Sequence, residues 1–249
     1  MGTRRCTRPS RIAPSMLLTA VTLVTSARAT AQPASTDDRR ASVAVVDFTI
    51  AALVPNASNW APLGKGMPQI LMTELAANRD LRIVERERIQ TVLDELKLTA
   101  SALADRETAA RVGKLVGARY IVTGAATIDP RNRIRLDVHG IRTETSVQEY
   151  ADNLLGPADD VLDLVARIGA TMSKRFDPTP FDAPSGGRSG DPGRPTRHGL
   201  RLAMLMGNAV ELHDRHNVDS AKVLVRQALA LAPDYPSAKA LLTSLEREK

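Results

Sequence analysis

The chain has 249 residues, of which 43% are hydrophobic and 25% are charged, and its formal net charge is +6. This length suits one or two domains with a packed core, so collagen-like, coiled-coil and wholly disordered chains are excluded. The sequence pI of about 9.8 raises nucleic-acid binding as a hypothesis. The single cysteine, Cys6, excludes an internal disulfide and a cysteine-based zinc cluster.

The N-terminal segment has the three parts of a cleaved secretory signal. Four arginines between residues 4 and 11 precede the apolar run Met16–Val24, and two overlapping A-x-A patterns end at Ala29 and Ala31. The apolar run is too short to span a bilayer, which needs about 20 residues. We therefore expect residues 1–31 to be removed during export to the periplasm.

Cleavage after Ala31 changes the charge of the chain. It removes five arginines and no acidic residue, so the mature chain of 218 residues has a net charge of +1 and no cysteine. A nucleic-acid partner is then not expected, because such binding needs a basic face and often aromatic platforms, and the seven aromatic residues are scattered. No lipid anchor and no transmembrane segment are expected in the mature chain, while association with the outer membrane is left open.

The first half of the mature chain alternates short β-rich runs with amphipathic helical patterns. Residues 32–41 are predicted to be a polar tether and residues 50–61 a loop. Strands are predicted over 42–49, 81–84, 119–128, 133–141 and 146–150. Helices are predicted over 62–78, 87–98, 108–116 and 158–176. The fold class is therefore α/β, with a small mixed sheet in residues 42–176.

Two residues bear on helix boundaries in this region. Pro68 falls within the first predicted helix, and proline is tolerated only in a first turn, so the regular helix is predicted to begin near Gly66. Gly117 is predicted to end the third helix as a C-cap.

The second half of the mature chain begins with a linker. Residues 177–196 hold five prolines and four glycines, so residues 177–199 are predicted to connect two separate parts. Beyond them, helices are predicted over 200–213, 219–231 and 237–246. The predicted organisation is a signal peptide (1–31), an α/β domain (42–176), a linker (177–199) and an all-helical segment (200–249).

No catalytic or metal-binding motif is complete. The run Gly64-Lys65-Gly66 lacks the first glycine and the hydroxyl residue of a phosphate loop. His213 and His216 have helical spacing but no further ligand nearby, so we expect two solvated imidazoles. The charged run Arg86-Glu87-Arg88 is predicted to be a solvated turn. We therefore expect no enzyme activity, no metal and no cofactor.

Three segments resemble the CsgG/HfaB family, whose prototype is the outer-membrane secretion channel for curli. They are Val43–Phe48, Leu81–Leu98 and Thr108–Gly124, and the last resembles a helix ending in G-A-x-Y before a strand ending in glycine. The resemblance extends to the TolB amino-terminal domain, to FlgO-like proteins and to outer-membrane activators of peptidoglycan synthases. It implies a small α/β periplasmic fold without catalytic residues.

The chain departs from the family prototype in two respects. It has no acceptor cysteine for lipidation, and its connections over 129–132 and 142–145 have no room for membrane hairpins, because each transmembrane strand needs about 9–11 residues. The resemblance therefore implies a non-enzymatic periplasmic accessory protein that acts by protein–protein contact in envelope assembly or secretion. The alternative is a subunit of an outer-membrane secretion channel complex, and homo-oligomerisation is left open.

The C-terminal segment resembles a tetratricopeptide repeat that begins at Leu202. Small residues and a proline fall at repeat positions 8, 20, 27 and 32, which are Ala209, Ala221, Ala228 and Pro233. Residues 234–245 resemble the first helix of a second repeat, and one and a half repeats are too few to be stable alone. In this family the inner face of the first helix binds ligands, which implies the protein-binding residues Ala203, Met206, Val210, His213 and Asp214. The alternative is that these side chains pack within the protein.

Overall fold

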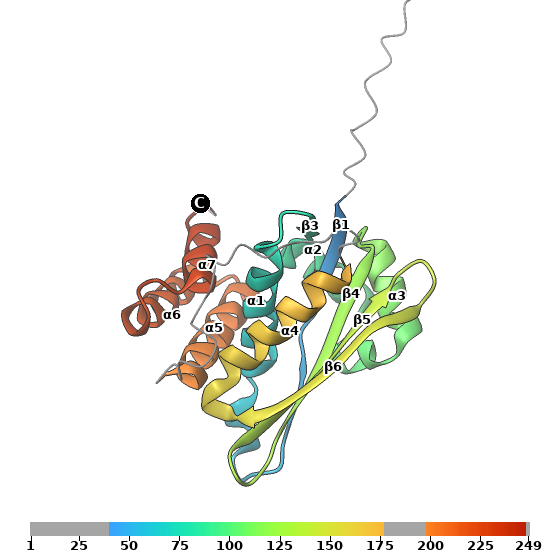
Figure 1. Cartoon of the computed structure of the whole chain (residues 1–249). Helices are drawn as coiled ribbons and strands as arrows, with labels where there is room; N and C mark the ends of the chain where they lie inside the picture. Colours follow the sequence, from blue (N-terminus) through green and yellow to red (C-terminus); the bar gives the residue numbers. More distant parts are fainter. Residues whose placement is uncertain (1–39, 177–197, 248–249) are drawn as a thin grey trace, which may run out of the picture. The chain divides into compact units, whose positions relative to one another are not determined.

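The computed structural model describes residues 40–176 and 198–247, which belong to one compact unit. The expected signal peptide, almost all of the tether and most of the linker lie outside the described residues. Within the described part, the α/β class is confirmed: a six-stranded mixed sheet is combined with seven α-helices (Figure 1).

The sheet has a parallel part and an antiparallel part. Its order is β3 (Leu81–Ile83), β1 (Ala41–Val45), β4 (Tyr120–Ile128), β5 (Arg133–Arg142) and β6 (Val147–Pro157). β1 pairs with β3 and β4 in parallel, whereas β4, β5 and β6 form an antiparallel meander. The connections β4–β5 and β5–β6 are four-residue turns over 129–132 and 143–146.

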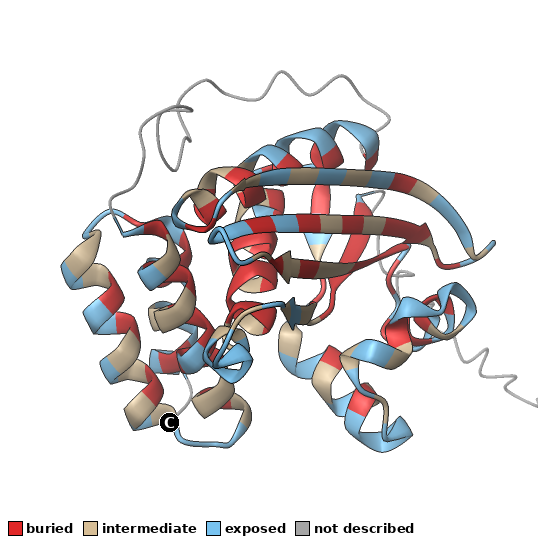
Figure 2. Ribbon diagram, turned by 90° about the horizontal axis from the view of Figure 1, so that it is seen from below, coloured by how far each residue is buried: buried red, intermediate tan, exposed pale blue. Residues whose placement is uncertain are grey.

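Helices cover the two faces of the sheet unequally. One core joins the sheet to α1 (Leu63–Ala76) and α4 (Val161–Phe176), which follows the short 3-10 helix η3 (Ala158–Asp160). A smaller core on the other face joins it to α2 (Arg86–Leu96), the 3-10 helix η2 (Ala100–Ala104) and α3 (Arg106–Leu115). Alternating strand residues serve the two cores: Val43 and Val45 face the first, and Ala44 faces the second. Figure 2 shows buried residues concentrated between these layers.

The single strand predicted over 42–49 is in fact two strands. β1 ends at Val45, and β2 (Thr49–Ala52) pairs in parallel with the second half of β4, where a loop was predicted. Another short 3-10 helix, η1 (Ala57–Trp60), follows β2. The break between β1 and β2 places Asp47 beyond the carboxyl end of β1.

The prediction that the first helix begins near Gly66 was wrong. α1 begins at Leu63 and contains Pro68 in its interior. Because proline has no N–H, the carbonyl of Gly64 has no partner four residues later. The backbone N–H of Phe48 donates to that carbonyl at 2.8 Å. The connection between β1 and β2 therefore supplies the hydrogen bond that Pro68 cannot make.

The C-terminal helices dock onto the α/β part. α5 (Gly199–Asp214) packs against α1 and α4, and it is followed by α6 (Val218–Leu231) and α7 (Pro236–Arg247). Apolar residues of all three helices belong to the same core as α1 and α4. We call these three helices the tail.

α1 and α5 approach to backbone contact at two glycines. A Cβ atom at Gly66 would lie 2.1 Å from the Ala203 carbonyl oxygen, and one at Gly207 would lie 1.8 Å from the Pro62 carbonyl oxygen. Only glycine can occupy these positions while the helices keep this separation. Gly117 ends α3 with a φ of 71°, in agreement with its predicted C-cap role.

Among the residues that the structure describes, no helix combines the length and the apolar character needed to cross a membrane.

Candidate functional site

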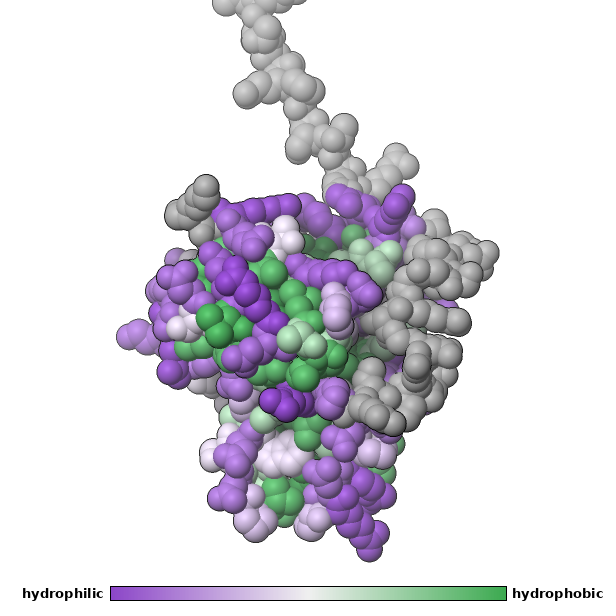
Figure 3. All heavy atoms as spheres, turned by 90° about the vertical axis from the view of Figure 1, so that its left-hand side faces the viewer, coloured by the Kyte–Doolittle hydropathy of each residue, from purple (hydrophilic) through white to green (hydrophobic). Residues whose placement is uncertain are grey.

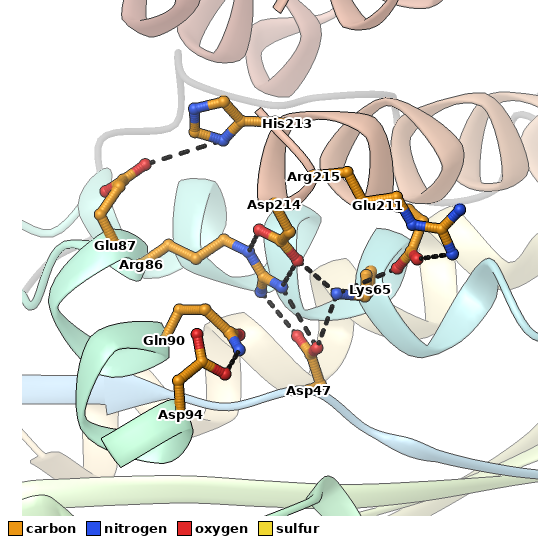
Figure 4. Close-up of polar contacts among 10 residues, drawn as sticks. All are labelled: Asp47, Lys65, Arg86, Glu87, Gln90, Asp94, Glu211, His213, Asp214 and Arg215. Atoms are coloured by element: carbon orange, nitrogen blue, oxygen red, sulfur yellow. Dashed lines mark hydrogen bonds and ion pairs between the residues drawn. The ribbon is translucent and has the colours of Figure 1, made fainter. Parts of the chain in front are cut away.

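The densest group of charged side chains lies beyond the carboxyl end of β1. The chain passes from β1 to its neighbour β3 through α1, which covers one face of the sheet. It then passes from β3 to the neighbour on the other side of β1, β4, through α2 and α3, which cover the opposite face. The connections therefore switch faces next to β1. Ligands of α/β sheets usually bind at such a switch point. Here the last turn of α5 lies at this place, because its Glu211 and Asp214 reach Lys65 and Arg86. Figure 4 shows the side chains that meet there, which we call the ion cluster: Asp47, Lys65, Arg86, Glu211 and Asp214.

Arg86 is the centre of the ion cluster. Its guanidinium donates to both oxygens of Asp47, at 2.6 and 3.1 Å, and its Nη2 donates to Asp214 Oδ2 at 3.0 Å. Only 10% of the side chain is exposed. The planar fork of arginine suits this double carboxylate recognition, which lysine could not reproduce.

Lys65 closes the cluster from the first turn of α1. Its Nζ donates to Asp214 and lies 3.1 Å from Glu211 Oε2 and 3.5 Å from Asp47 Oδ2. Glu211 also pairs with Arg215 one helical turn later. Three carboxylates thus surround two cations, and every one of the five groups has an opposite charge within ion-pair distance.

The pKa values of Lys65, Asp214 and Glu211 move away from neutrality. Burial alone lowers the pKa of Lys65, but its hydrogen bond to Asp214 and the charge of Asp47 raise it above its usual value. Burial alone raises the pKa of Asp214, but Arg86 and Lys65 lower it below its usual value. The pKa of Glu211 is lowered by Lys65 and Arg215 against the same effect of burial. A general acid or base needs a pKa near the working pH, so these shifts favour permanent ion pairs over proton transfer.

Two sequence expectations about charged side chains were wrong here. Arg86 does not lie in a solvated turn, because its side chain is largely removed from solvent between the carboxylates of Asp47, in the connection after β1, and Asp214, in α5. His213 is not a solvated imidazole: it is 9% exposed, and its Nδ1 lies 4.0 Å from Glu87 Oε1. His216 is exposed, as expected. Within the described part of the chain, no group of three or more His, Cys, Asp or Glu side chains could hold a metal ion.

The five residues predicted to bind a protein partner all face the α/β part. Ala203, Met206 and Val210 are fully buried in the shared core, while His213 and Asp214 reach Glu87 and the ion cluster. This burial favours the alternative in which the inner face of α5 packs internally. Their role in binding a partner stays a prediction, and so does the tetratricopeptide assignment.

The sequence pattern indicated Asp214 as a binding residue but did not indicate its ion-pair partners Lys65 and Arg86. Lys65 was noted only as part of an incomplete phosphate loop, and Asp47 only as part of a family segment. The position of Asp47 directly after a buried strand could have indicated a site, because the carboxyl ends of parallel strands carry the functional groups of such sheets. Nothing local in the sequence indicates that Arg86 points toward α5.

Comparison with known proteins gives one family match. The model of the curli production assembly/transport component CsgG matches residues 22–128, which is less than half of the chain. The matched segment includes β1 to β4 and the site residues Asp47, Lys65 and Arg86, and it ends before β5 and the tail. No curated protein matches the sequence significantly.

Solved structures show distant likeness. The LpoB C-terminal domain from Salmonella enterica is 16% identical, with a TM-score of 0.35 over 50% of this chain and 87% of that chain. TolB from Acinetobacter baumannii is 15% identical, with a TM-score of 0.38 over 58% of this chain and 30% of that chain. A PelC dodecamer from Paraburkholderia phytofirmans is 15% identical, with a TM-score of 0.35 over 56% of this chain and 91% of that chain. These similarities are too distant to bear on function.

Proposed function

We propose that the chain is a non-enzymatic periplasmic accessory protein that acts by protein–protein contact in envelope assembly or secretion. The observation that carries this proposal is the match of residues 22–128 to the CsgG family, together with the secretory signal expected before residue 32. The charged site supports it, because its groups pair with one another.

The outer surface of the tail supports contact with another protein. With the inner face of α5 buried, a partner would meet the opposite side of these helices. Val223 of α6 is 52% exposed, and Leu224, Leu229 and Leu231 of the same helix are partly exposed. Figure 3 shows hydrophobic residues gathered on the left-hand side of Figure 1, where the tail lies. Exposed apolar surface of this kind marks interaction sites on many proteins.

Crosslinking in the native host tests this proposal. A photoreactive residue at Val223 of the full chain is expected to capture a defined envelope protein, whereas the same residue at exposed Lys97 is not. Osmotic shock followed by a wash with high salt is expected to release the chain with Gln32 as its first residue. Enzymatic turnover that remains with the protein through exhaustive purification would contradict the proposal, as would recovery from the cytoplasm with an intact signal.

A further inference from the structure

Basic side chains form a row at the end of the sheet where the parallel strands begin. Arg82 of β3 lies beside Ser42 of β1 in the parallel register. The backbone N–H of Arg119 donates to the Ser42 carbonyl at 2.8 Å, which places Arg119 next in the row. The carbonyl of Arg119 in turn accepts from the N–H of Thr143, the residue that follows Arg142 in the chain, at 3.0 Å. The row therefore crosses β3, β1, β4 and β5.

The last turn of α4 continues the same row. Arg175 Nε donates to the carbonyl of Glu149 in β6 at 3.0 Å, and Lys174 precedes it in the helix. We call this surface the basic end, and it comprises Arg82, Arg119, Arg142, Lys174 and Arg175. In Figure 1 it lies at the top, where β1 begins and α4 ends.

Most of these charges are not neutralised locally. Arg142 pairs with Glu149, but Arg82, Arg119 and Lys174 are exposed and have no ion pair among the described residues. Glu144 also acts on the charge of Arg142, and Asp80 directly precedes β3. The basic end is therefore electropositive, although the mature chain as a whole is almost neutral.

Two exposed apolar side chains are close to basic residues of this surface in the chain or in the strand register. Leu115 is 53% exposed in the last turn of α3, four residues before Arg119. Val147 is 52% exposed at the start of β6, opposite Arg142 in the strand register. Basic residues with apolar neighbours suit a phospholipid surface, where headgroups attract the charge and the boundary with the acyl chains accepts the apolar side chains. A soluble polyanion offers no place for the apolar side chains.

The path of the chain agrees with an orientation in which the basic end faces a phospholipid surface. Arg40 leads directly into β1, so the segment that follows the expected signal peptide joins the protein at the basic end.

We propose that the basic end binds the surface of a membrane that contains anionic phospholipid. Each basic side chain near such a surface strengthens the partition by about fivefold. Replacement of three of them, in the variant R82Q/R119Q/K174Q, is therefore expected to weaken binding by about a hundredfold. High salt is expected to weaken binding of the unchanged protein, because it screens the attraction.

Vesicle co-sedimentation of the mature full chain tests the proposal. Vesicles of equal parts phosphatidylglycerol and phosphatidylcholine are expected to bind the chain, and vesicles of phosphatidylcholine alone are not. The variant R131Q/R201Q/R226Q changes the net charge equally at exposed positions outside the basic end, so it is expected to bind nearly as well as the unchanged chain. The variant L115S/V147S is expected to lose vesicle binding while keeping its charge.

Three results would overturn the proposal. One is equal binding by the two charge variants, which would indicate attraction by net charge alone. Another is no binding to the anionic vesicles. The third is binding to soluble poly-glutamate that competes with vesicles and is unchanged in L115S/V147S, which would assign the basic end to an acidic polymer or protein. Because the assay uses purified protein and lipid only, its outcome is independent of any protein partner.

Discussion

At the scale of single residues, Arg86 connects parts of the chain that are far apart in sequence. It binds Asp47, which is 39 residues away, and Asp214, which is 128 residues away. Its side chain is 10% exposed and those of Asp47 and Asp214 are partly buried, so the three groups depend on one another. Removing one member of a buried ion pair leaves the other charge without compensation, which costs far more than an exposed pair contributes.

Replacement of Arg86 by glutamine is therefore expected to lower the free energy of unfolding by about 3 kcal/mol. The matched control is Arg88→Gln, two residues later on the same helix, where the side chain is exposed and the change should stay within about 0.5 kcal/mol. Urea denaturation of the mature chain measures both values. Similar losses in the two variants would show that Arg86 contributes only as a surface charge.

The ion cluster also predicts how stability depends on pH. The ordinary pKa values of the Asp214 and Glu211 carboxyls are 3.8 and 4.5, and both are lowered in the folded chain. The unfolded chain therefore takes up protons first as the pH falls, so this stabilisation is complete at neutral pH and is lost in acid. Lys65 behaves in the opposite sense: its raised pKa means that its contribution is lost only as the pH rises above about 10.5.

Urea midpoints measured from neutral pH to about pH 3 should thus fall in acid, with a steeper fall in the unchanged chain than in Asp214→Asn. Asp219→Asn, which alters an exposed carboxylate in α6, serves as the control and should keep the steep fall. An identical acid dependence in Asp214→Asn and the unchanged chain would contradict the assigned role of Asp214.

At the scale of elements, the crossing of α1 and α5 determines how the tail is held. Glycine is unfavourable in a helix interior by roughly 1 kcal/mol relative to alanine, so alanine would be preferred at Gly66 and Gly207 if only the helices mattered. The close approach of the two backbones reverses this preference. The crossing also brings the last turn of α5 to the carboxyl end of β1, where Asp214 meets Arg86.

Gly207→Ala is accordingly expected to destabilise the chain by about 3 kcal/mol, because overpacking at a backbone contact forces the helices apart. Asn208→Ala, at the exposed neighbouring position, is the control and should be neutral. Hydrogen exchange should show faster exchange of α5 amides in Gly207→Ala alone. A stabilised Gly207→Ala variant would mean that the helices do not approach as described.

At the scale of the whole molecule, the tail and the α/β part share one hydrophobic core. α1 is buried on the side of the sheet and on the side of the tail, and residues of α5, α6 and α7 complete the same cluster. Shared burial of this kind couples the unfolding of the two parts, because neither part can unfold without exposing apolar side chains of the other to water.

The mature chain is therefore expected to unfold in one cooperative transition. Slowly exchanging amides of α1, α4 and α5 should report the same opening free energy, and fluorescence and circular dichroism should give the same urea midpoint. Separate transitions, with the tail unfolding first, would instead show that residues 198–247 form an independent domain.

Local patterns predicted much of the secondary structure. Helical spacing of apolar residues indicated α2, α3, α4 and the tail helices, and alternation indicated β5, because such periodicities record which face of an element is buried. β2 was missed, since the segment Thr49–Ala52 has no alternation and is held by β4, about 75 residues further along the chain. β6 was predicted to end at Tyr150, but it continues to Pro157 as the partner of β5.

The sequence by itself thus determined the α/β class, the C-cap at Gly117 and, as an expectation, the export of the chain. Only the tertiary structure decided that Pro68 lies inside a helix, that Arg86 lies between two carboxylates and that the inner face of α5 rests on α1. The physical reason is the same in each case. A backbone N–H from Phe48, two carboxylates and two glycines settle these features, and each comes from a distant part of the chain that no local pattern can identify.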